Sequence, residues 1–274
     1  MSAASRVYDS HRRRAPALEE LADVVEYRSL IAALVERNLK VRYKRSVLGV
    51  VWTLLSPAAM IAALSLVFST PFARQAPSYP AFAAPGIILW AFFAQTTSGV
   101  AGEVAGGVDL WRRVRFPRTA LAAATVLTGL ANLVFALVPL LVLMALSRRP
   151  LGPPLASLPL TIILTGIFVF GAALLLAAVA LSFPDVADLW TLLLPALMFT
   201  APVAYPASIV TGRAGTLLRL NPMTHFVEAF RAPLYSGTAP SPGELGAMAL
   251  VAGGTLAAGW LLFTRRAGAL PYRG

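Results

Sequence analysis

The sequence contains no cysteine and only two histidines, His11 and His225. The absence of cysteine excludes disulfides, thiolate metal sites and cysteine nucleophiles, and it leaves the redox compartment open. Two histidines so far apart cannot form the HExxH motif of a zinc enzyme, and no cluster of histidines has metal-ligand spacing. We therefore expect no metal site and no metal catalysis in this chain.

Lysine is equally rare, because Lys40 and Lys44 are the only two in the chain. A phosphate-binding P-loop needs a lysine directly after a glycine, in the pattern GxxxxGK[ST], so that its ammonium group reaches the nucleotide phosphates. The residues before the two lysines are Leu39 and Tyr43. The chain therefore lacks this ATP site, and we expect it to carry no cofactor of its own.

Charged residues make up only 13% of the 274 residues, whereas 58% are hydrophobic and the mean hydropathy is +0.72. A soluble globule of this size needs far more polar surface. Six long stretches carry no charge, and each can cross about 30 Å of hydrocarbon as a helix of roughly 20 residues. The uncharged stretches are residues 46–73, 75–102, 119–147, 150–184, 189–212 and 245–264.

These stretches predict an all-α, polytopic membrane protein with six transmembrane helices. We expect a cytoplasmic tail over residues 1–27 and one transmembrane domain over residues 28–274. The six spans are expected at about residues 48–70, 82–104, 119–146, 157–181, 189–206 and 244–264.

The 23 basic residues are unevenly distributed about these spans. If the N-terminus is cytoplasmic, seventeen of them fall on the inner side, before residue 46 and in segments 112–118 and 265–273, and six fall on the outer side. The positive-inside rule then places both termini in the cytoplasm. The net charge of +11 reflects this topology, so we expect no nucleic-acid partner. The first thirty residues contain no apolar core of signal-peptide length, so the first span is expected to act as its own insertion signal.

A helix over residues 28–45 is predicted to be amphipathic and to lie in the membrane interface. Its polar face carries Glu36, Lys40 and Lys44, which recur every four residues. Arg42 and Arg45 fall within the apolar arc, where such long side chains either extend to lipid headgroups or face a protein partner. Both alternatives remain open at this point.

The long connection between the fifth and sixth spans is predicted to contain an outer-face helix over residues 221–234. Asn221 is a favoured cap residue, and Pro222 suits the first helical position. We expect Glu228 and Arg231 to remain near water, in a local surface network with His225. The apolar residues that share the opposite face are Met223, Phe226, Val227, Phe230 and Leu234.

Four acidic residues lie near the predicted inner ends of spans, Glu103, Asp109, Asp185 and Asp188, and none of the twelve in the chain falls in the middle of an uncharged stretch. A proton-coupled or ion-coupled transporter usually carries an ionisable residue at midplane depth, and no acidic residue falls there in this chain. Secondary transport is therefore disfavoured. The remaining possibility is a protein that moves a substrate while another chain supplies the energy.

The segment that leads into the first span reads Arg37-Asn-Leu-Lys-Val-Arg-Tyr-Lys-Arg-Ser-Val-Leu-Gly49, followed by Val50-Val-Trp-Thr-Leu-Leu-Ser-Pro57. This pattern closely resembles ABC-2-type permeases that export O-antigen, teichoic acid and related lipid-linked polysaccharides. The resemblance covers about residues 28 to 264, in the family's order. Further matches are Val114-Arg-Phe-Pro-Arg118, Thr200-Ala-Pro-Val-Ala-Tyr-Pro206, Asn221-Pro222-Met223, and Phe226, Val227, Glu228 and Arg231.

The resemblance implies a homodimer of six-span subunits in the bacterial plasma (inner) membrane. It also implies two copies of a separately encoded cytoplasmic ABC ATPase, which would bind ATP and magnesium. The missing P-loop agrees with ATP binding by a separate subunit. The chain itself is therefore expected to be a transporter permease and not an enzyme.

In the family, the interface helix and the loop between the second and third spans form the surface that faces the ATPase. A second contact, between spans four and five, usually contains Arg-Asp, whereas here the sequence is Ser182-Phe-Pro-Asp185 and lacks the arginine. A salt-bridging role at that contact stays open. The implied contact residues are Arg37, Lys40, Arg42, Lys44, Trp111, Arg113, Arg115, Phe116, Arg118 and Asp185.

Substrate handling is predicted from aromatic residues, because sugar rings pack their C–H faces on aromatic rings. The second span offers Phe82, Trp90, Phe92 and Phe93 as a substrate path, and the alternative is that these side chains pack against helices or face lipid. We expect the helix over residues 221–234 to form part of an outer gate. The gate residues are expected to be Asn221, Pro222, Phe226, Phe230 and Arg231.

Together these features predict the membrane-spanning permease subunit of an ATP-driven exporter of a lipid-linked polysaccharide, such as O-antigen, teichoic acid or a similar cell-envelope glycan, surrounded by membrane lipids. An ABC-2-type exporter of a drug or small lipid is the close alternative. An integral-membrane glycosyltransferase or acyltransferase is another, for which only His225 with Glu228 offers an acid and a base. A purely structural membrane scaffold is the third.

Overall fold

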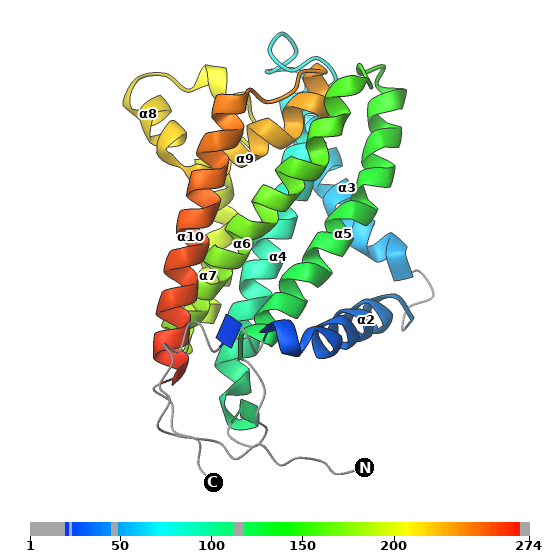
Figure 1. Ribbon diagram of the computed structural model, residues 1–274. Coiled ribbons are helices and arrows are strands. Elements are labelled where there is room, and N and C mark those ends of the chain that lie inside the picture. Colours follow the sequence, from blue (N-terminus) through cyan, green and yellow to red (C-terminus); the bar gives the residue numbers. More distant parts are fainter. Residues whose placement is uncertain (1–19, 22–23, 45–48, 112–117, 269–274) are drawn as a thin grey trace, which may run out of the picture.

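The computed structural model describes residues 20–21, 24–44, 49–111 and 118–268, with the backbone alone at residues 42–44, 49–54, 107–111 and 118. All regular elements within these ranges are helices. Long helices form a bundle, one helix lies across one end of it, and short helices lie at the other end (Figure 1). The fold is therefore all-α, as the uncharged stretches predict.

Four long helices make up most of the bundle, and each contains a stretch that is long and apolar enough to cross a membrane. A helix pairs its backbone N–H and C=O groups internally, which a segment in hydrocarbon requires. The helices are α4 (Tyr79–Trp111), α5 (Arg118–Leu146), α6 (Leu158–Ala180) and α10 (Pro242–Gly268). The stretches are Tyr79–Gly106, Thr119–Leu146, Pro153–Ala180 and Pro242–Ala267.

Two further apolar helices, α3 (Gly49–Phe68) and α7 (Val186–Leu197), accompany these four. Their apolar stretches among the described residues, Leu55–Phe68 and Val186–Thr200, are shorter than a full span. Even with the 3-10 turn η2 (Met198–Thr200), α7 rises only about 22 Å at roughly 1.5 Å per residue. Within the part of the chain that the structure describes, length and composition thus identify four spans, and the six-span arrangement stays a prediction.

The fifth expected span, residues 189–206, is helical only as far as Thr200. Pro202 and Pro206 lie beyond that point, and a proline has no N–H to donate and disfavours a helical conformation of the residue before it. The segment after Thr200 is nevertheless buried, with Ala201 and Val203 fully inaccessible to solvent. The chain therefore continues inside the bundle without helical hydrogen bonds.

Helices α6 and α10 pack closely through glycines. A Cβ atom at Gly259 would lie 2.3 Å from the carbonyl oxygen of Gly171, and one at Gly171 would lie 2.4 Å from the backbone nitrogen of Leu256. Small residues allow helix backbones to approach in this way inside a membrane. Only glycine fits at either position.

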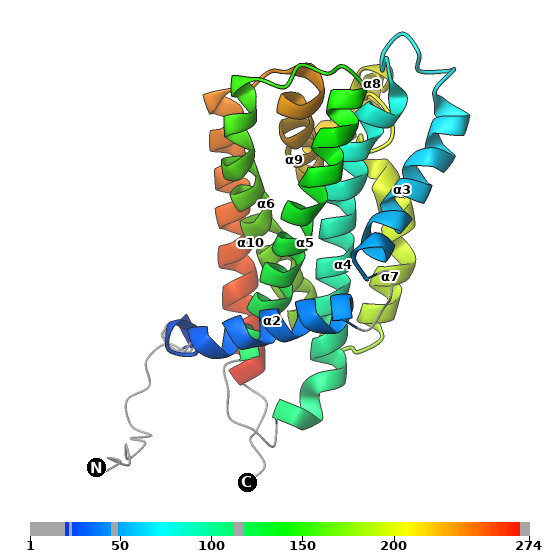
Figure 2. The ribbon, with the colours of Figure 1, turned by 90° about the vertical axis from the view of Figure 1, so that its right-hand side faces the viewer.

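Helix α2 (Arg28–Lys44) lies across the end of the bundle where α4 ends and α5 begins (Figure 2). Its residue Ile31 is buried together with Ala120 of α5. Glu20 accepts hydrogen bonds from both the backbone N–H and the hydroxyl of Thr119, each at 3.0 Å. A carboxylate at a helix N-terminus is favourable, so part of the expected tail over residues 1–27 holds the start of α5. We call this end of the bundle the α2 end.

The opposite end carries α8 (Gly212–Leu220) and α9 (Pro222–Arg231), and a π-helical turn, η4 (Ala232–Ser236), continues α9 (Figure 1). Two 3-10 turns, η1 (Pro153–Ser157) and η3 (Ala207–Ile209), lie in the connections before α6 and α8. We call this end the α9 end.

Candidate functional site

The buried, non-helical segment 200–206 is the starting point for the candidate site. Backbone carbonyls that are removed from water need hydrogen-bond partners, and segments of irregular backbone at membrane depth need them most. Here the partners come from the start of α4 and from both ends of α9. We define the 200–206 junction as this segment together with Tyr79, Phe82, Gly86, Asn221 and Arg231.

Arg231, the last residue of α9, contributes two of these hydrogen bonds. Its Nη2 atom donates to the carbonyl oxygens of Pro202 and Val203, both at 2.8 Å. Its guanidinium carbon also lies 4.0 Å from the centre of the Phe82 ring, in a cation–π contact. Burial lowers the pKa of Arg231 to about 10, so the side chain remains a cation at neutral pH.

The expectation that Arg231 remains near water is wrong, because only 6% of the residue is exposed. The expectation rested on the local spacing to Glu228, three residues earlier. The two carbonyl oxygens and the aromatic ring instead take the place of water around the guanidinium group. A buried charge is tolerated only where such groups surround it.

Tyr79 and Asn221 hold the two ends of the same segment. The Tyr79 hydroxyl donates to the carbonyl oxygen of Ala204 at 2.5 Å. The Asn221 Nδ2 atom donates to the carbonyl and hydroxyl oxygens of Thr200 at 2.9 and 3.0 Å. At the same time the Asn221 Oδ1 atom accepts from the backbone N–H of Met223 at 3.0 Å, which caps α9. Asn221 thus caps the N-terminus of α9 and holds the end of η2 through hydrogen bonds to Thr200.

Gly86 of α4 is the position at which the junction tolerates no side chain. A Cβ atom there would lie 2.6 Å from Arg231 Nη2 and 2.7 Å from the carbonyl oxygen of Val203. These are the donor and one acceptor of the hydrogen bonds described above. The glycine therefore makes room for the buried arginine.

Contacts between arginine side chains and aromatic rings extend from the junction toward the connection before α6. The ring of Phe82 meets that of Tyr235 edge to face, with 5.5 Å between centroids. The guanidinium carbon of Arg149 lies 4.0 Å from the centre of the Tyr235 ring. Both Arg149 and Tyr235 donate hydrogen bonds to the carbonyl oxygen of Pro77. The adjacent rings of Phe82 and Tyr235 are thus contacted by the guanidinium groups of Arg231 and Arg149, respectively.

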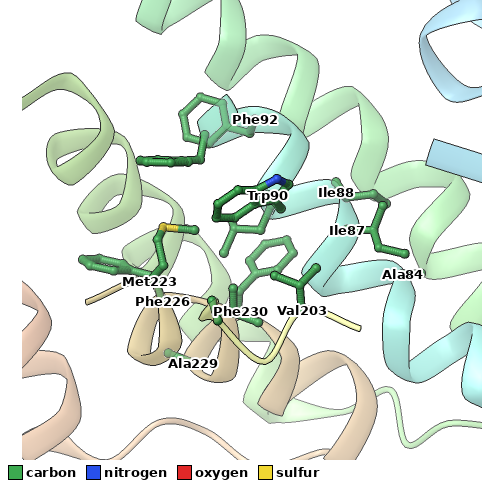
Figure 3. Close-up of a cluster of buried hydrophobic side chains, with 14 of the residues drawn as sticks. Ala84, Ile87, Ile88, Trp90, Phe92, Val203, Met223, Phe226, Ala229 and Phe230 are labelled. Atoms are coloured by element: carbon green, nitrogen blue, oxygen red, sulfur yellow. The ribbon is translucent and has the colours of Figure 1, made fainter. Parts of the chain in front are cut away.

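The apolar face of α9 packs into the bundle. Figure 3 shows Met223, Phe226 and Phe230 close to Trp90 of α4. The Phe226 ring stacks on Phe168 of α6 at 4.7 Å between centroids. All five residues of the predicted stripe are buried, at 3% exposure or less: Met223, Phe226, Val227, Phe230 and Leu234.

The pair His225 and Glu228, which the transferase alternative requires, lies on the opposite and exposed face of α9. The Nε2 atom of His225 lies 2.9 Å from the carbonyl oxygen of Arg219 in α8. This is the local surface contact that the spacing along α9 predicts.

The four aromatic residues of the expected substrate path, Phe82, Trp90, Phe92 and Phe93, are all buried within the subunit. Phe93 lies 5.3 Å from Trp90 and 6.2 Å from Phe168, measured between ring centroids. These contacts favour the alternative that the rings pack helices together. Phe92 differs from the others because it also lines a cavity between α3, α4 and α5.

The residues expected to face an ATPase lie at the α2 end wherever they are described (Figures 1 and 2). Arg37 and Lys40 are exposed on α2, and Lys40 forms an ion pair with Glu36. Asp185, directly before α7, is exposed and does not cap that helix.

The backbone of four further residues is described, without their side chains. Arg42 and Lys44 belong to α2, Trp111 ends α4, and Arg118 begins α5. The remaining three contact residues lie outside the described residues: Arg113, Arg115 and Phe116.

Sequence reasoning missed Tyr79, Gly86, Arg149 and Tyr235. Their partners are distant along the chain, at separations of 72 residues for Arg149, 125 for Tyr79 and 158 for Tyr235. Helical periodicity carries no information over such distances. The one available signal is that Tyr79 begins a span, where aromatic residues with a polar group are enriched.

Comparison with known proteins places this site in a family. A family model described as ABC-2 type transporter matches residues 29–235, which include α9 and the 200–206 junction. The chain is 32% identical over 232 residues to the O-antigen export system permease protein RfbA of Myxococcus xanthus, covering 84% of this chain and 89% of that protein. It is 27% identical over 240 residues to the polysialic acid transport protein KpsM of Escherichia coli, covering 86% and 93%. A protein of Klebsiella pneumoniae, also named O-antigen export system permease protein RfbA, is 23% identical over 210 residues, covering 76% and 81%. Since the family model spans most of the chain and these relatives align over most of their length, the chain belongs to the ABC-2 type transporter family.

Proposed function

We propose that this chain is the membrane-spanning permease subunit of an ATP-driven exporter of a lipid-linked cell-envelope polysaccharide. The observation that carries the proposal is the alignment over 84% to 86% of the chain with relatives named for O-antigen export and polysialic acid transport. Both named cargoes are long glycans. Residues 200–206 and the Asn221-Pro222-Met223 motif, which meet at the 200–206 junction, both lie within the region that the family model matches.

The proposed topology has six spans, with α3 and α7 as the first and fifth. The α2 end is cytoplasmic in this arrangement, because seventeen of the 23 basic residues then face the cytoplasm. Helix α2 lies in the inner interface and α9 at the outer side. The short α7 is compatible with this topology, because irregular backbone at membrane depth is tolerated where it is buried in protein.

The proposed assembly is a homodimer bound to two copies of a separate ATPase, which would hold ATP and magnesium. The exposed apolar side chains on α7 and η2 support a membrane or subunit contact there: Leu189, Leu192, Leu193 and Phe199. The ATPase contact is proposed for the exposed basic face of α2 and the neighbouring helix ends.

Helix α4 offers a mechanical connection between the two ends. It is continuous over 33 residues from Tyr79 to Trp111, a rise of about 50 Å. Its first residues belong to the 200–206 junction, and its last residue belongs to the expected ATPase surface. Movement imposed by the ATPase at the α2 end would therefore reach the α9 end through a single helix.

The test is surface display of the glycan in cells that lack this chain. Cells without it are expected to synthesise the polymer but retain it inside, and the intact chain should restore display, as detected by a lectin or antibody on unpermeabilised cells. Unchanged display, combined with lost resistance to a drug, would instead support the drug-exporter alternative.

The outer-gate role of α9 is tested separately from the transferase alternative. Phe230→Asp places a charge in a fully buried position, which is expected to stop display while the chain still copurifies with its ATPase. His225→Ala and Glu228→Gln change exposed residues and are expected to leave display unchanged. The gate assignment would be abandoned if those two variants lost activity while Phe230→Asp kept it.

A further inference from the structure

Helix α8 presents an apolar face that is not covered by any part of the chain that the structure describes. Its residues Gly215 and Leu218 are buried, and the helix packs mainly against α9. On the other side, Leu217 and Leu220 are 68% and 73% exposed. Because residues three apart lie on the same face of a helix, the two leucines form one exposed apolar surface.

The level at which α8 lies explains why leucines can be exposed there. Figure 1 shows α8 at the α9 end, level with the first turns of α10 and at the margin of the bundle. The membrane-length apolar stretch of α10 begins in those turns, at Pro242. Helix α8 therefore lies where the headgroups of a bilayer meet its acyl chains. At this level leucine side chains are favourable in lipid and unfavourable in water.

The charges on α8 are all of one sign. Between Pro206 and Glu228 the only formally charged residues are Arg213 and Arg219, and both are exposed. Glu228 of α9 interacts more strongly with Arg231 and His225 than with Arg219, so the charge of Arg219 stays largely available. A guanidinium group binds phosphate through parallel N–H donors, and its long side chain reaches from an apolar surface to the headgroups. The face thus combines acyl-chain contacts with phosphate donors.

Helix α8 is also joined to α9 at its last turn, where backbone carbonyls have no partner within the helix. The hydroxyl of Thr224 donates to the carbonyl oxygen of Leu218 at 2.6 Å. The Nε2 atom of His225 lies 2.9 Å from the carbonyl oxygen of Arg219. A lipid that holds α8 in place would therefore also position α9.

We propose that the exposed face of α8 binds an anionic phospholipid, of the phosphatidylglycerol type, from the leaflet on the α9 side. Leu217 and Leu220 contact its acyl chains, and Arg213 and Arg219 contact its phosphate. This assignment does not depend on which substrate the chain exports.

The experiment uses the absence of cysteine, because a single introduced thiol then carries a fluorophore at one known position. Full-length Leu217→Cys and Leu220→Cys are labelled and reconstituted into phosphatidylcholine vesicles that contain a fixed fraction of brominated phosphatidylglycerol or brominated phosphatidylcholine. Brominated acyl chains quench the fluorophore on contact. We expect both lipids to quench, with phosphatidylglycerol bound about fivefold more tightly, the factor expected for one arginine near an anionic lipid.

Two controls separate the charge from the apolar face. Leu250→Cys carries the label on α10, at a position that is 79% exposed and lies in a stretch without charged residues from Leu245 to Thr264. The two brominated lipids should quench this label equally. Leu217→Cys combined with Arg213→Gln and Arg219→Gln should still be quenched by both lipids, but without the fivefold preference.

Equal quenching by the two lipids at positions 217 and 220 would overturn the headgroup assignment, and so would a preference that persists without the two arginines. Absence of quenching by either brominated lipid would overturn the membrane contact itself. Quenching by aqueous iodide would then place the face in water. Protection from iodide as well would show that a second copy of the chain covers it.

Discussion

At the residue scale, the guanidinium group of Arg231 replaces the hydrogen bonds that segment 200–206 loses when α7 ends. The Arg231 Nη2 atom donates to two carbonyl oxygens, and the guanidinium carbon lies 4.0 Å from the centre of the Phe82 ring. A lysine ammonium also has several N–H donors, but it is not planar and would not stack on the ring in the same way. The junction therefore depends on the identity of this residue and not only on its charge.

Arg231→Leu is expected to lower the thermal stability of the purified chain, because two buried carbonyls lose their donor. Each unpaired group costs roughly 1–3 kcal/mol. Arg231→Lys should recover only part of the loss. Arg213→Leu, on the exposed surface of α8, is the control and should leave the melting temperature unchanged. Equal stability of Arg231→Leu and Arg213→Leu would contradict the assignment.

Gly86→Ala is expected to disturb the same junction through one added methyl group. The methyl carbon would sit 2.6 Å from Arg231 Nη2, so the arginine or segment 200–206 must move. Gly102→Ala, on the same helix, meets nothing within 4 Å and should be neutral or stabilising by about 1 kcal/mol. Melting temperatures and glycan display of the two variants provide the measurement. A Gly86→Ala protein that behaves like Gly102→Ala would show that the close contact is relaxed at no cost.

At the scale of secondary-structure elements, the start of α5 is held by a residue that lies far away in sequence. Glu20 accepts two hydrogen bonds from Thr119, 99 residues later. The contact ties the N-terminal region to the α2 end of the bundle.

Glu20→Ala is expected to weaken this N-terminal cap by about 1 kcal/mol. Hydrogen exchange of the amides in the first turn of α5 should become about fivefold faster, since 1.4 kcal/mol corresponds to roughly tenfold. Glu26→Ala, at an exposed position of the same region, serves as the comparison. Identical exchange in the two variants would mean that Glu20 does not support α5.

The sequence predicted some of these elements and not others, for identifiable reasons. The uncharged runs predict the long helices because an uncharged stretch of about 20 residues has few alternatives to a membrane span. Asn221 followed by Pro222 marks the start of α9 because both effects are local. The end of helical structure after Thr200 has a local signal in Pro202 and Pro206. The burial of Arg231 could not be predicted, because it depends on contacts with residues 28 and 29 positions earlier.

The residues of the candidate site were likewise only partly predictable from the sequence. The residues expected at the ATPase surface follow from the family resemblance and gather at one end where described. The aromatic residues of α4 were open to two interpretations, because composition does not reveal whether a ring faces a path or a neighbouring helix. The stacking of Phe93 on Phe168 of α6, which itself stacks on Phe226 of α9, depends on the arrangement of those helices.

At the scale of the whole molecule, the distribution of basic residues predicts the orientation in the membrane. A reporter fused after Gly274 is expected to be active in the cytoplasm, and one inserted after Arg213 is expected to be active outside. An extracytoplasmic reporter at Gly274 would contradict the six-span topology.

Coupling to the ATPase is predicted to require the end of α4. Trp111→Ala should weaken ATPase binding about thirtyfold, the factor that corresponds to about 2 kcal/mol at a buried aromatic contact. Arg213→Ala, on α8 at the other end, should have no effect. Equal binding by Trp111→Ala and Arg213→Ala would remove α4 from the contact surface.

The glycine contact between α6 and α10 limits how the molecule can move. A slide of α10 along α6 by one turn would bring Thr255 or Phe263 opposite Gly171, where not even a Cβ atom fits. The two helices therefore have a single register. In a transport cycle, α6 and α10 are expected to move together as one unit and not to slide past each other.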